Sequence, residues 1–155
     1  MMPKLWVLVG VPGSGKTTWI ANQTWDMSKT AFISTDDHVE AHAREQGKTY
    51  SEVFDEYMPT AIARMTEQVY AARASGKDIV WDQTSTTIKS RARKFRMLPE
   101  YEAVAIVFPD LPDEELRRRL QSRPGKVIPQ RVIYQMREHF EMPTLTEGFK
   151  EVIIV

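Results

Sequence analysis

The chain has 155 residues, about the length of one domain, and its hydrophobic (42%) and charged (27%) fractions are those of an ordinary globular protein. Its 21 basic and 21 acidic residues balance, which excludes a protein that holds nucleic acid by bulk positive charge but does not exclude a local basic groove. The absence of cysteine excludes disulfides, thiolate zinc sites and cysteine nucleophiles, and three histidines leave little for a histidine-rich metal site.

No apolar segment approaches the ~20 residues that cross a bilayer as a helix. The N-terminal apolar run, residues 5–9, is too short for the core of a signal peptide and leads straight into glycine. Without a targeting signal, we expect a cytoplasmic protein that has no membrane partner. The sequence shows no repeat, low-complexity tract or linker, so we expect one domain over residues 1–155.

Short apolar runs mark the expected strands. The first, Leu5 to Val9, is continuously apolar and ends at a glycine, which is typical of a strand buried on both faces of a parallel sheet. Four later runs have the same character and predict strands over residues 31–33, 78–81, 103–108 and 151–155.

Polar, periodic stretches separate these runs and predict helices over residues 16–23, 51–75, 87–98, 113–121 and 129–140. We expect Pro59 to break or kink the second helix and Gly76 to cap it, and Pro129 to lie in the first turn of the last. Strands that alternate with helices predict an α/β fold, in which helices cover both faces of a mostly parallel sheet of about five strands.

Residues 10–17 match the phosphate-binding pattern G-x-x-x-x-G-K-[ST] between a predicted strand and a predicted helix. The glycines allow turns that direct backbone N–H groups at phosphate oxygens. Lys16 would place its charge on the β- and γ-phosphates, and the Thr17 hydroxyl would bind Mg²⁺. The alternative is a glycine-rich turn that only joins the strand to the helix. The residues expected to contact the nucleotide are Gly10, Pro12, Gly13, Ser14, Gly15, Lys16, Thr17 and Thr18.

Carboxylates follow two of the predicted strands. Asp82 ends the run over residues 78–81 and would hold Mg²⁺ or its water, unless it only stabilises the following turn. Asp36 and Asp37 come shortly after residues 31–33, at the edge of an open sheet where ligands bind. A carboxylate there can accept the proton of an attacking hydroxyl. The alternative is that Thr35, Asp36 or Asp37 caps a following helix.

Taken in order, these pieces resemble the kinase domain of the phage-type polynucleotide 5′-hydroxyl kinases. The resemblance covers most of the chain and rests on Gly10 to Trp19, the Asp36-Asp37 pair, the Asp82-Gln83-Thr84 turn and a basic segment over residues 116–129. It implies a single-domain P-loop kinase fold with an arginine-bearing lid, and a bacterial or phage-infected cell. It also implies ATP, or another nucleoside triphosphate, as donor and Mg²⁺ as cofactor.

Carried over by residue, the resemblance implies that Asp36 is the general base and that Arg123 stabilises the transferring phosphoryl group. Arg119 and Lys126 would support the lid, with Arg119 also on the nucleotide. The family has an arginine three residues after the base that contacts the acceptor phosphate, and here that position is Val39. A valine cannot bind phosphate, so acceptor recognition differs, and His38, Arg44 or Lys48 are open as substitutes. No D-x-D-G-T motif is present, so the phosphatase half of some relatives is absent.

A second group of basic residues lies on the predicted helix over residues 87–98 and would give a local positive field for a nucleic-acid acceptor. The alternative is a solvated helix face. Tyr50 lies near the expected acceptor side, where it would stack on a base or pack internally. The residues expected to contact the acceptor are Asp37, His38, Arg91, Arg93 and Arg96.

We therefore expect an enzyme that transfers the γ-phosphate of ATP to a 5′-hydroxyl end of DNA or RNA, with nucleic-acid ends as its partner. Lys16, Asp36 and Arg123 are the expected catalytic residues, and Thr17 and Asp82 the expected metal ligands. A kinase of hydroxymethylated bases in DNA and a small-molecule or nucleotide kinase remain open, and a P-loop ATPase without acceptor is less favoured. The sequence leaves the oligomeric state open.

Overall fold

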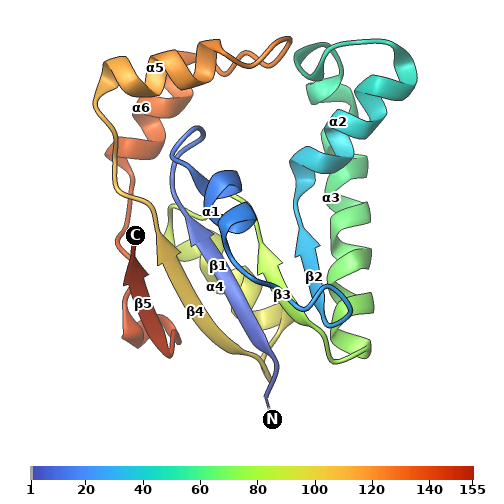
Figure 1. Cartoon of the computed structure of the whole chain (residues 1–155), viewed down its shortest axis with the longest axis vertical. Coiled ribbons are helices and arrows are strands. Elements are labelled where there is room, and N and C mark those ends of the chain that lie inside the picture. Colours follow the sequence, from blue (N-terminus) through green and yellow to red (C-terminus); the bar gives the residue numbers. More distant parts are fainter. Residues whose placement is uncertain (1) are drawn as a thin grey trace.

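Five parallel strands form the centre of the protein (Figure 1). The computed structural model describes residues 2–155. The strands lie in the order β2-β3-β1-β4-β5, and every neighbouring pair is parallel. Each begins and ends within one residue of a predicted apolar run, so the α/β prediction is confirmed. The strands are β1 (Lys4–Val9), β2 (Thr30–Ile33), β3 (Asp78–Trp81), β4 (Glu102–Val107) and β5 (Glu151–Ile154).

Helices cover both faces of the sheet, as the alternating pattern predicts (Figure 1). On one face, Val7 of β1 packs in a cluster with α3 (Tyr50–Ala74) and α4 (Ile88–Met97). On the other face, the neighbouring residue Leu8 packs in a cluster with α1 (Lys16–Asn22). Both side chains are at most 1% exposed. The central strand therefore contributes alternate residues to two apolar layers.

One helix, α2 (Thr35–Gln46), was not among the predicted elements. Its sequence is mostly polar, and its buried apolar residues are Val39 and Ala43. They pack with Val53 and Ala61 of α3 in a cluster separate from the sheet. Because this narrow apolar stripe serves one neighbouring helix rather than the sheet, the pattern is too weak to identify the helix from the sequence.

The expected break at Pro59 does not occur, because α3 continues through it for 25 residues. Pro59 is exposed, so water can bond the carbonyl that the proline leaves without its helical donor. Val53 and Ala61, on either side of it, both pack against α2. Gly76, with φ +66°, follows the last turn and closes the helix, as its position predicts.

A second pair of helices, α5 (Asp113–Gln121) and α6 (Gln130–Glu138), packs on the opposite side of the β1–α1 loop. Leu116 of α5 and Ile133 of α6 cluster with Val11 of that loop. The segment between the two helices, residues 122–129, is called the lid below, and in Figure 1 it extends across to the α2–α3 connection.

A short 3₁₀ turn, Leu145–Glu147, precedes β5. Among residues 2–155, no helix combines the length and the apolar character that crossing a membrane requires.

Lys94 is one of the basic residues of α4, but it is buried. Its side chain lies inside the layer between α4 and the sheet, with the Nζ atom 4.9 Å from the centre of the Trp81 ring. Burial lowers the pKa of Lys94 from its ordinary 10.5 to about 8, and the charges of Arg93 and Arg91 act in the same direction. The folded protein therefore binds this proton more weakly than the unfolded chain does. The buried charge therefore lowers the free energy of unfolding. This destabilisation is fully present below pH 8 and disappears as the pH rises towards 10.5.

We expect Lys94→Met to increase the free energy of unfolding by about 1–2 kcal/mol at pH 7, because the loss of the attraction to Trp81 offsets part of the relief. The gain should shrink as the pH approaches 10.5. Urea denaturation at both pH values measures it. Lys89→Met, an exposed lysine of the same helix, is the matched control. An equal effect of Lys94→Met at pH 7 and near pH 10.5 would contradict the lowered pKa of Lys94.

Candidate active site

The loop between β1 and α1 requires glycine at two points. Gly15 has φ +107°, in the left-handed region, immediately before α1 begins. A Cβ atom at Gly10 would lie 2.5 Å from Ser14 Oγ and 2.9 Å from Phe108 Cβ. The backbone therefore passes close to its neighbours where the strand ends, as the phosphate-loop pattern predicts.

Several donors of this loop are available to an anion. Lys16 Nζ donates to the carbonyl oxygens of Gly10 and Val11, at 2.9 Å each. Ser14 Oγ is one of two buried side-chain polar atoms that lack a hydrogen-bond partner among residues 2–155. No side chain caps the N-terminus of α1. These residues fit a nucleoside triphosphate, because its phosphate oxygens would accept from all of these groups.

Charged side chains from three other parts of the chain act on the Lys16 ammonium. Burial lowers the pKa of Lys16 to about 8, and the charges of Asp82 and Asp36 oppose that shift. The positive charges of Arg123 and Lys126 lower the pKa further. The structure thus brings residues of α1, α2, the β3 end and the lid to one place, at the carboxyl ends of the strands.

Asp82 stands beside the phosphate loop. The N–H of Gly10 donates to Thr84 O at 3.0 Å, and the N–H of Asp82 donates to Ile33 O at 2.8 Å, which ties the β3 end to both neighbours. Burial raises the pKa of Asp82, and the charge of Lys16 opposes this. Within residues 2–155, no hydrogen bond holds the carboxylate to the following turn, contrary to the alternative that it only stabilises that turn.

Magnesium would have two protein ligands here, Thr17 and Asp82. No group of three or more histidine, aspartate or glutamate side chains that could hold a metal ion occurs in residues 2–155. This donor set fits Mg²⁺, which binds through one or two protein oxygens together with phosphates and water.

Asp36 lies in the first turn of α2 with its side chain 47% exposed. The residue that caps this helix is Ser34, whose Oγ accepts from the N–H of Asp37 at 3.4 Å. The alternative that Thr35, Asp36 or Asp37 provides the cap is therefore wrong. Because the cap lies one residue earlier, the Asp36 carboxylate is free of the helix backbone and can face the lid.

Two side chains from distant parts of the sequence hold this carboxylate. Tyr50, the first residue of α3, donates its hydroxyl to Asp36 Oδ1 at 2.6 Å. Lys126 of the lid donates to Asp36 Oδ2 at 3.0 Å and lies 3.5 Å from Glu40 Oε1. Sequence reasoning placed Tyr50 near the acceptor but missed this contact. Nothing in the sequence marks it, because the pairing depends on how α2 packs against α3.

The residues after Asp36 face different ways. Burial raises the pKa of Asp37, and the negative charges of Glu40 and Asp36 act in the same direction. His38 is held towards α3, where its Nε2 atom is 2.9 Å from Gln68 Oε1. Val39 is 0% exposed between α2 and α3. Residue 39 therefore points into a packed apolar layer. It cannot contact a phosphate, because its side chain is apolar and because it is directed away from the site.

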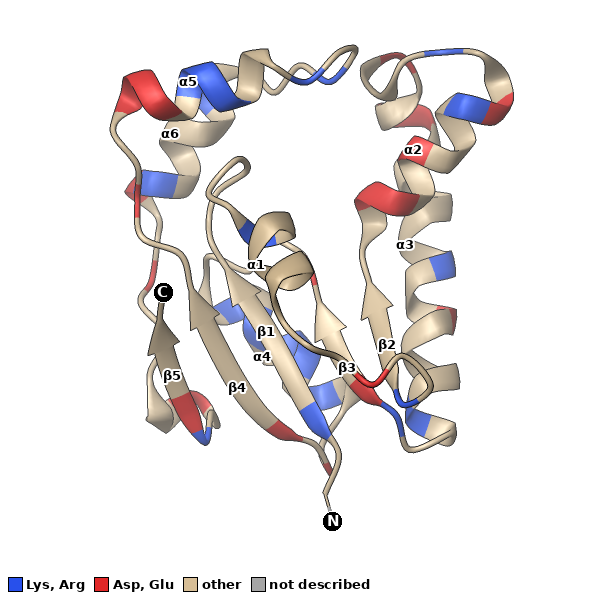
Figure 2. Ribbon diagram, viewed as in Figure 1, with Lys and Arg blue, Asp and Glu red and all other residues tan. Residues whose placement is uncertain are grey.

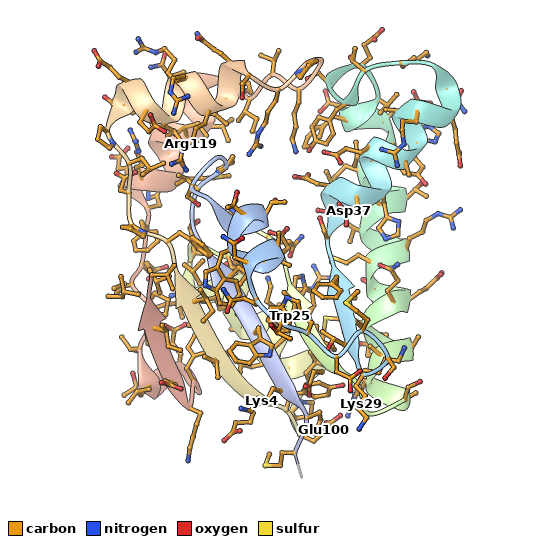
Figure 3. All side chains as sticks on the ribbon, in the orientation of Figure 1. Lys4, Trp25, Lys29, Asp37, Glu100 and Arg119 are labelled. Atoms are coloured by element: carbon orange, nitrogen blue, oxygen red, sulfur yellow. The ribbon has the colours of Figure 1, made fainter. Side chains whose placement is uncertain are left out.

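Arg119 of α5 and Arg123 of the lid approach the phosphate loop from the other side. Arg119 of α5 donates from Nη1 to Gly13 O at 3.3 Å and from Nε to Glu115 at 2.8 Å. Figure 3 places Arg119 and Asp37 on the two sides of the loop, on α5 and α2. Arg123 lies close enough to Lys16 for its charge to lower the pKa of that lysine. Arg119 therefore contacts the phosphate loop, and the roles of both arginines in catalysis stay predictions.

The prediction that Arg91 contacts an acceptor is wrong. Its side chain is 0% exposed and forms an ion pair with Glu147, with an Nε–Oε1 distance of 2.8 Å. Its remaining donors reach Ser85 O at 2.9 Å and Glu141 O at 2.8 Å. These hydrogen bonds, together with one from Nη2 to Glu147 Oε2, join α4 to the segment that precedes β5.

Arg93 and Arg96 are exposed on α4, but the structure does not bring them to the phosphate loop. The helix covers the face of the sheet opposite α1. Figure 2 shows its basic residues behind the sheet, away from the acidic start of α2. The exposed arginines of this helix therefore lie apart from the start of α2 (Figure 2).

The family model described as the AAA domain matches residues 5–143. The mouse (Mus musculus) heterogeneous nuclear ribonucleoprotein U-like protein 2 is 24% identical over 94% of this chain. The chain spans 20% of the length of that protein.

Solved structures share the fold. The crystal structure of a candidate kinase from Chloroflexus aurantiacus J-10-fl is 19% identical with a TM-score of 0.71, over 100% of this chain and 88% of that one. A chain in the structure of the Pnkp1/Rnl/Hen1 RNA repair complex is 26% identical with a TM-score of 0.64, over 90% of this chain and 47% of that one.

We expect Lys16→Met to weaken binding of Mg-ATP about tenfold to a hundredfold, because one charge-assisted phosphate contact is lost. Isothermal titration calorimetry measures this. Lys29→Met, at an exposed lysine near the opposite end of the sheet (Figure 3), is the matched control. Equal dissociation constants for the two variants would contradict the phosphate-binding assignment.

We expect Arg91→Met to lower the free energy of unfolding by about 3–5 kcal/mol, because it leaves the Glu147 carboxylate buried without its partner. The exposed Arg93, changed to Met, should alter stability by only about 0.5 kcal/mol. Urea denaturation followed by tryptophan fluorescence compares them. Similar stabilities of the two variants would show that the buried ion pair is not structural.

Proposed function

The chain belongs to the AAA domain family, and we propose that it is an ATP-dependent kinase that phosphorylates 5′-hydroxyl ends of DNA or RNA. Its P-loop, kinase-like fold is that of a phosphotransferase, whichever acceptor it uses. In this proposal residues 1–155 are one catalytic domain that uses Mg²⁺. The observation that carries the proposal is that Asp36, Asp82 and the lid residue Arg123 all lie close enough to Lys16 for their charges to shift its pKa.

The arrangement supports a transfer with Asp36 as general base. The acceptor oxygen forms a bond to the γ-phosphorus as its proton passes to the Asp36 carboxylate. The bond between that phosphorus and the β–γ bridging oxygen breaks, and its electron pair leaves with ADP. Lys16 and Arg123 supply positive charge where it develops on the transferring group. Mg²⁺, held through Thr17 and Asp82, would neutralise charge on the β- and γ-phosphates.

A nucleic-acid end is supported as acceptor by two observations. The ordered set of phosphate loop, Asp36-Asp37 pair, Asp82 turn and basic lid resembles polynucleotide kinases. The solved chain that is 26% identical to this one comes from an RNA repair complex. In addition, Lys126 and Arg123 place positive charge near Asp36, where an acceptor's own phosphates could bind.

A second candidate is a kinase of hydroxymethylated bases in DNA or of a small hydroxyl compound. The observation that favours it is the acidic start of α2, where Asp36, Asp37 and Glu40 lie together. Val39 is buried beside them, and the basic residues of α4 lie away from them (Figure 2). A neutral acceptor would need no phosphate contact at these positions.

Transfer of labelled γ-phosphate from ATP separates the two candidates. The acceptors are a 5′-hydroxyl oligonucleotide, the same oligonucleotide with a 5′-phosphate, DNA that contains hydroxymethylated bases, and free nucleosides. Label on the 5′-hydroxyl oligonucleotide that a 5′-phosphate abolishes supports the first candidate. Label on hydroxymethylated DNA whose 5′ ends carry phosphate, or on free nucleosides in preference to the 5′-hydroxyl oligonucleotide, moves the acceptor to the second. Label on none of them contradicts both nucleic-acid proposals.

We expect Asp36→Asn to reduce kcat by about 10²–10⁴-fold, because the amide cannot accept the proton of the attacking hydroxyl. The dissociation constant for Mg-ATP should change little, since Asp36 lies on the acceptor side. Steady-state kinetics and calorimetry give the two values. Asp55→Asn, at an exposed acid of α3, is the control. Equal losses of turnover and ATP binding in Asp36→Asn would make Asp36 a structural residue instead.

A further inference from the structure

Each oxygen of the Asp36 carboxylate already accepts a hydrogen bond from this chain. Tyr50 occupies Oδ1 at 2.6 Å and Lys126 occupies Oδ2 at 3.0 Å. A proton that arrived at Oδ2 would neutralise the carboxylate and remove its attraction for the Lys126 ammonium, and the new O–H would face an N–H donor instead of an acceptor. For Asp36 to take a proton from an acceptor hydroxyl, Lys126 has to move to another negative group.

The structure holds Lys126 in this place from both sides. The N–H of Ser51 donates to Gly125 O at 3.0 Å, and the N–H of Val127 donates to Ser51 Oγ at 2.8 Å. Gly125 has φ +70°, and a Cβ there would lie 2.8 Å from Thr49 Cβ. The lid is thereby docked on the start of α3, and the lysine between its two backbone contacts is aimed at Asp36.

The Lys126 side chain is nonetheless able to change direction. A cavity of about 420 Å³ lies between α5, α6 and the lid, and Arg123 and Lys126 both line it. Lys126 Nζ is 4.4 Å from the centre of the Tyr50 ring, a contact that a flexible lysine can leave. The lysine stem can therefore turn while the lid backbone stays docked.

Position 39 does not supply the cation that an anionic acceptor would need. Val39 is buried between α2 and α3, and His38 is held by Gln68. Lys126 is the cation that contacts Asp36 directly, and its side chain is only 11% exposed. An ammonium so placed would bind an anion strongly, since water screens it little.

We propose that Lys126 is an exchangeable counter-ion that selects acceptors with a phosphate beside the reacting hydroxyl. Without acceptor it pairs with Asp36. With acceptor it pairs with that phosphate, which frees Asp36 Oδ2 to take the hydroxyl proton while the hydroxyl oxygen bonds to the γ-phosphorus and ADP leaves. The inference rests on the proposed function and adds the recognition group that Val39 does not provide.

Two acceptors that differ only in the phosphate test this inference: a nucleoside and its 3′-phosphate, both with a free 5′-hydroxyl. The enzyme should prefer the 3′-phosphate in kcat/KM by about tenfold to a hundredfold, as one charge-assisted contact predicts. Lys126→Met should abolish the preference by raising KM for the 3′-phosphate alone. Lys126→Arg should restore most of it. Lys150→Met, at an exposed lysine immediately before β5, should leave it unchanged.

Calorimetric binding of the same two compounds, without ATP, provides a readout that needs no turnover. Wild-type protein should bind the 3′-phosphate more tightly than the nucleoside, and Lys126→Met should bind the two equally. A preference that survives Lys126→Met, or a wild-type protein without preference, overturns the inference even when a 5′-hydroxyl is labelled. If neither compound is labelled, the proposed function fails for these acceptors, and the calorimetric comparison alone decides the role of Lys126.

Discussion

Parallel pairing of all five strands is the constraint on which the site depends. It brings the carboxyl ends of β1, β2 and β3 to one edge, where they deliver the phosphate loop, Asp36 and Asp82. Because β1 is central and buried on both faces, small displacements at this edge would disturb two apolar layers at once. The rigid sheet thus fixes the side of the site that would bind the nucleotide. The helices α2, α3, α5 and α6, beyond the carboxyl ends of the strands, provide the residues that would contact the acceptor.

These helices form two pairs, α2 with α3 and α5 with α6, which are called walls here because they flank the site, and each pair has its own apolar core. The α2–α3 wall is held by the cluster around Val39 and Ala61, and the α5–α6 wall by the cluster around Leu116 and Ile133. Between them, the lid contributes backbone hydrogen bonds to Ser51 and the Lys126–Asp36 pair. The contacts across the site are therefore polar and few, whereas those within each wall are apolar. Such a division allows the walls to separate without loss of either core.

Local patterns predicted the sheet well, because a strand buried on both faces has to be continuously apolar. The phosphate loop could also be predicted from local sequence, since glycine is the residue that adopts the positive φ angles of this loop. Two failures were local, the position of the α2 cap and the expected break at Pro59, and the others involve partners distant in sequence. The basic pattern of α4 could not reveal that Arg91 pairs with Glu147, 56 residues away. Likewise α2 is too polar to be recognised before α3 is in place, and the Tyr50–Asp36 contact depends on their packing.

The two carbonyl contacts of Lys16 have a consequence for the phosphate loop itself. Its ammonium donates to the carbonyl oxygens of Gly10 and Val11, so the first residue of α1 is tied back to the residues that follow β1. These hydrogen bonds offset part of the cost of burying the charge. The same lysine is thus a cross-link of the loop as well as a source of positive charge.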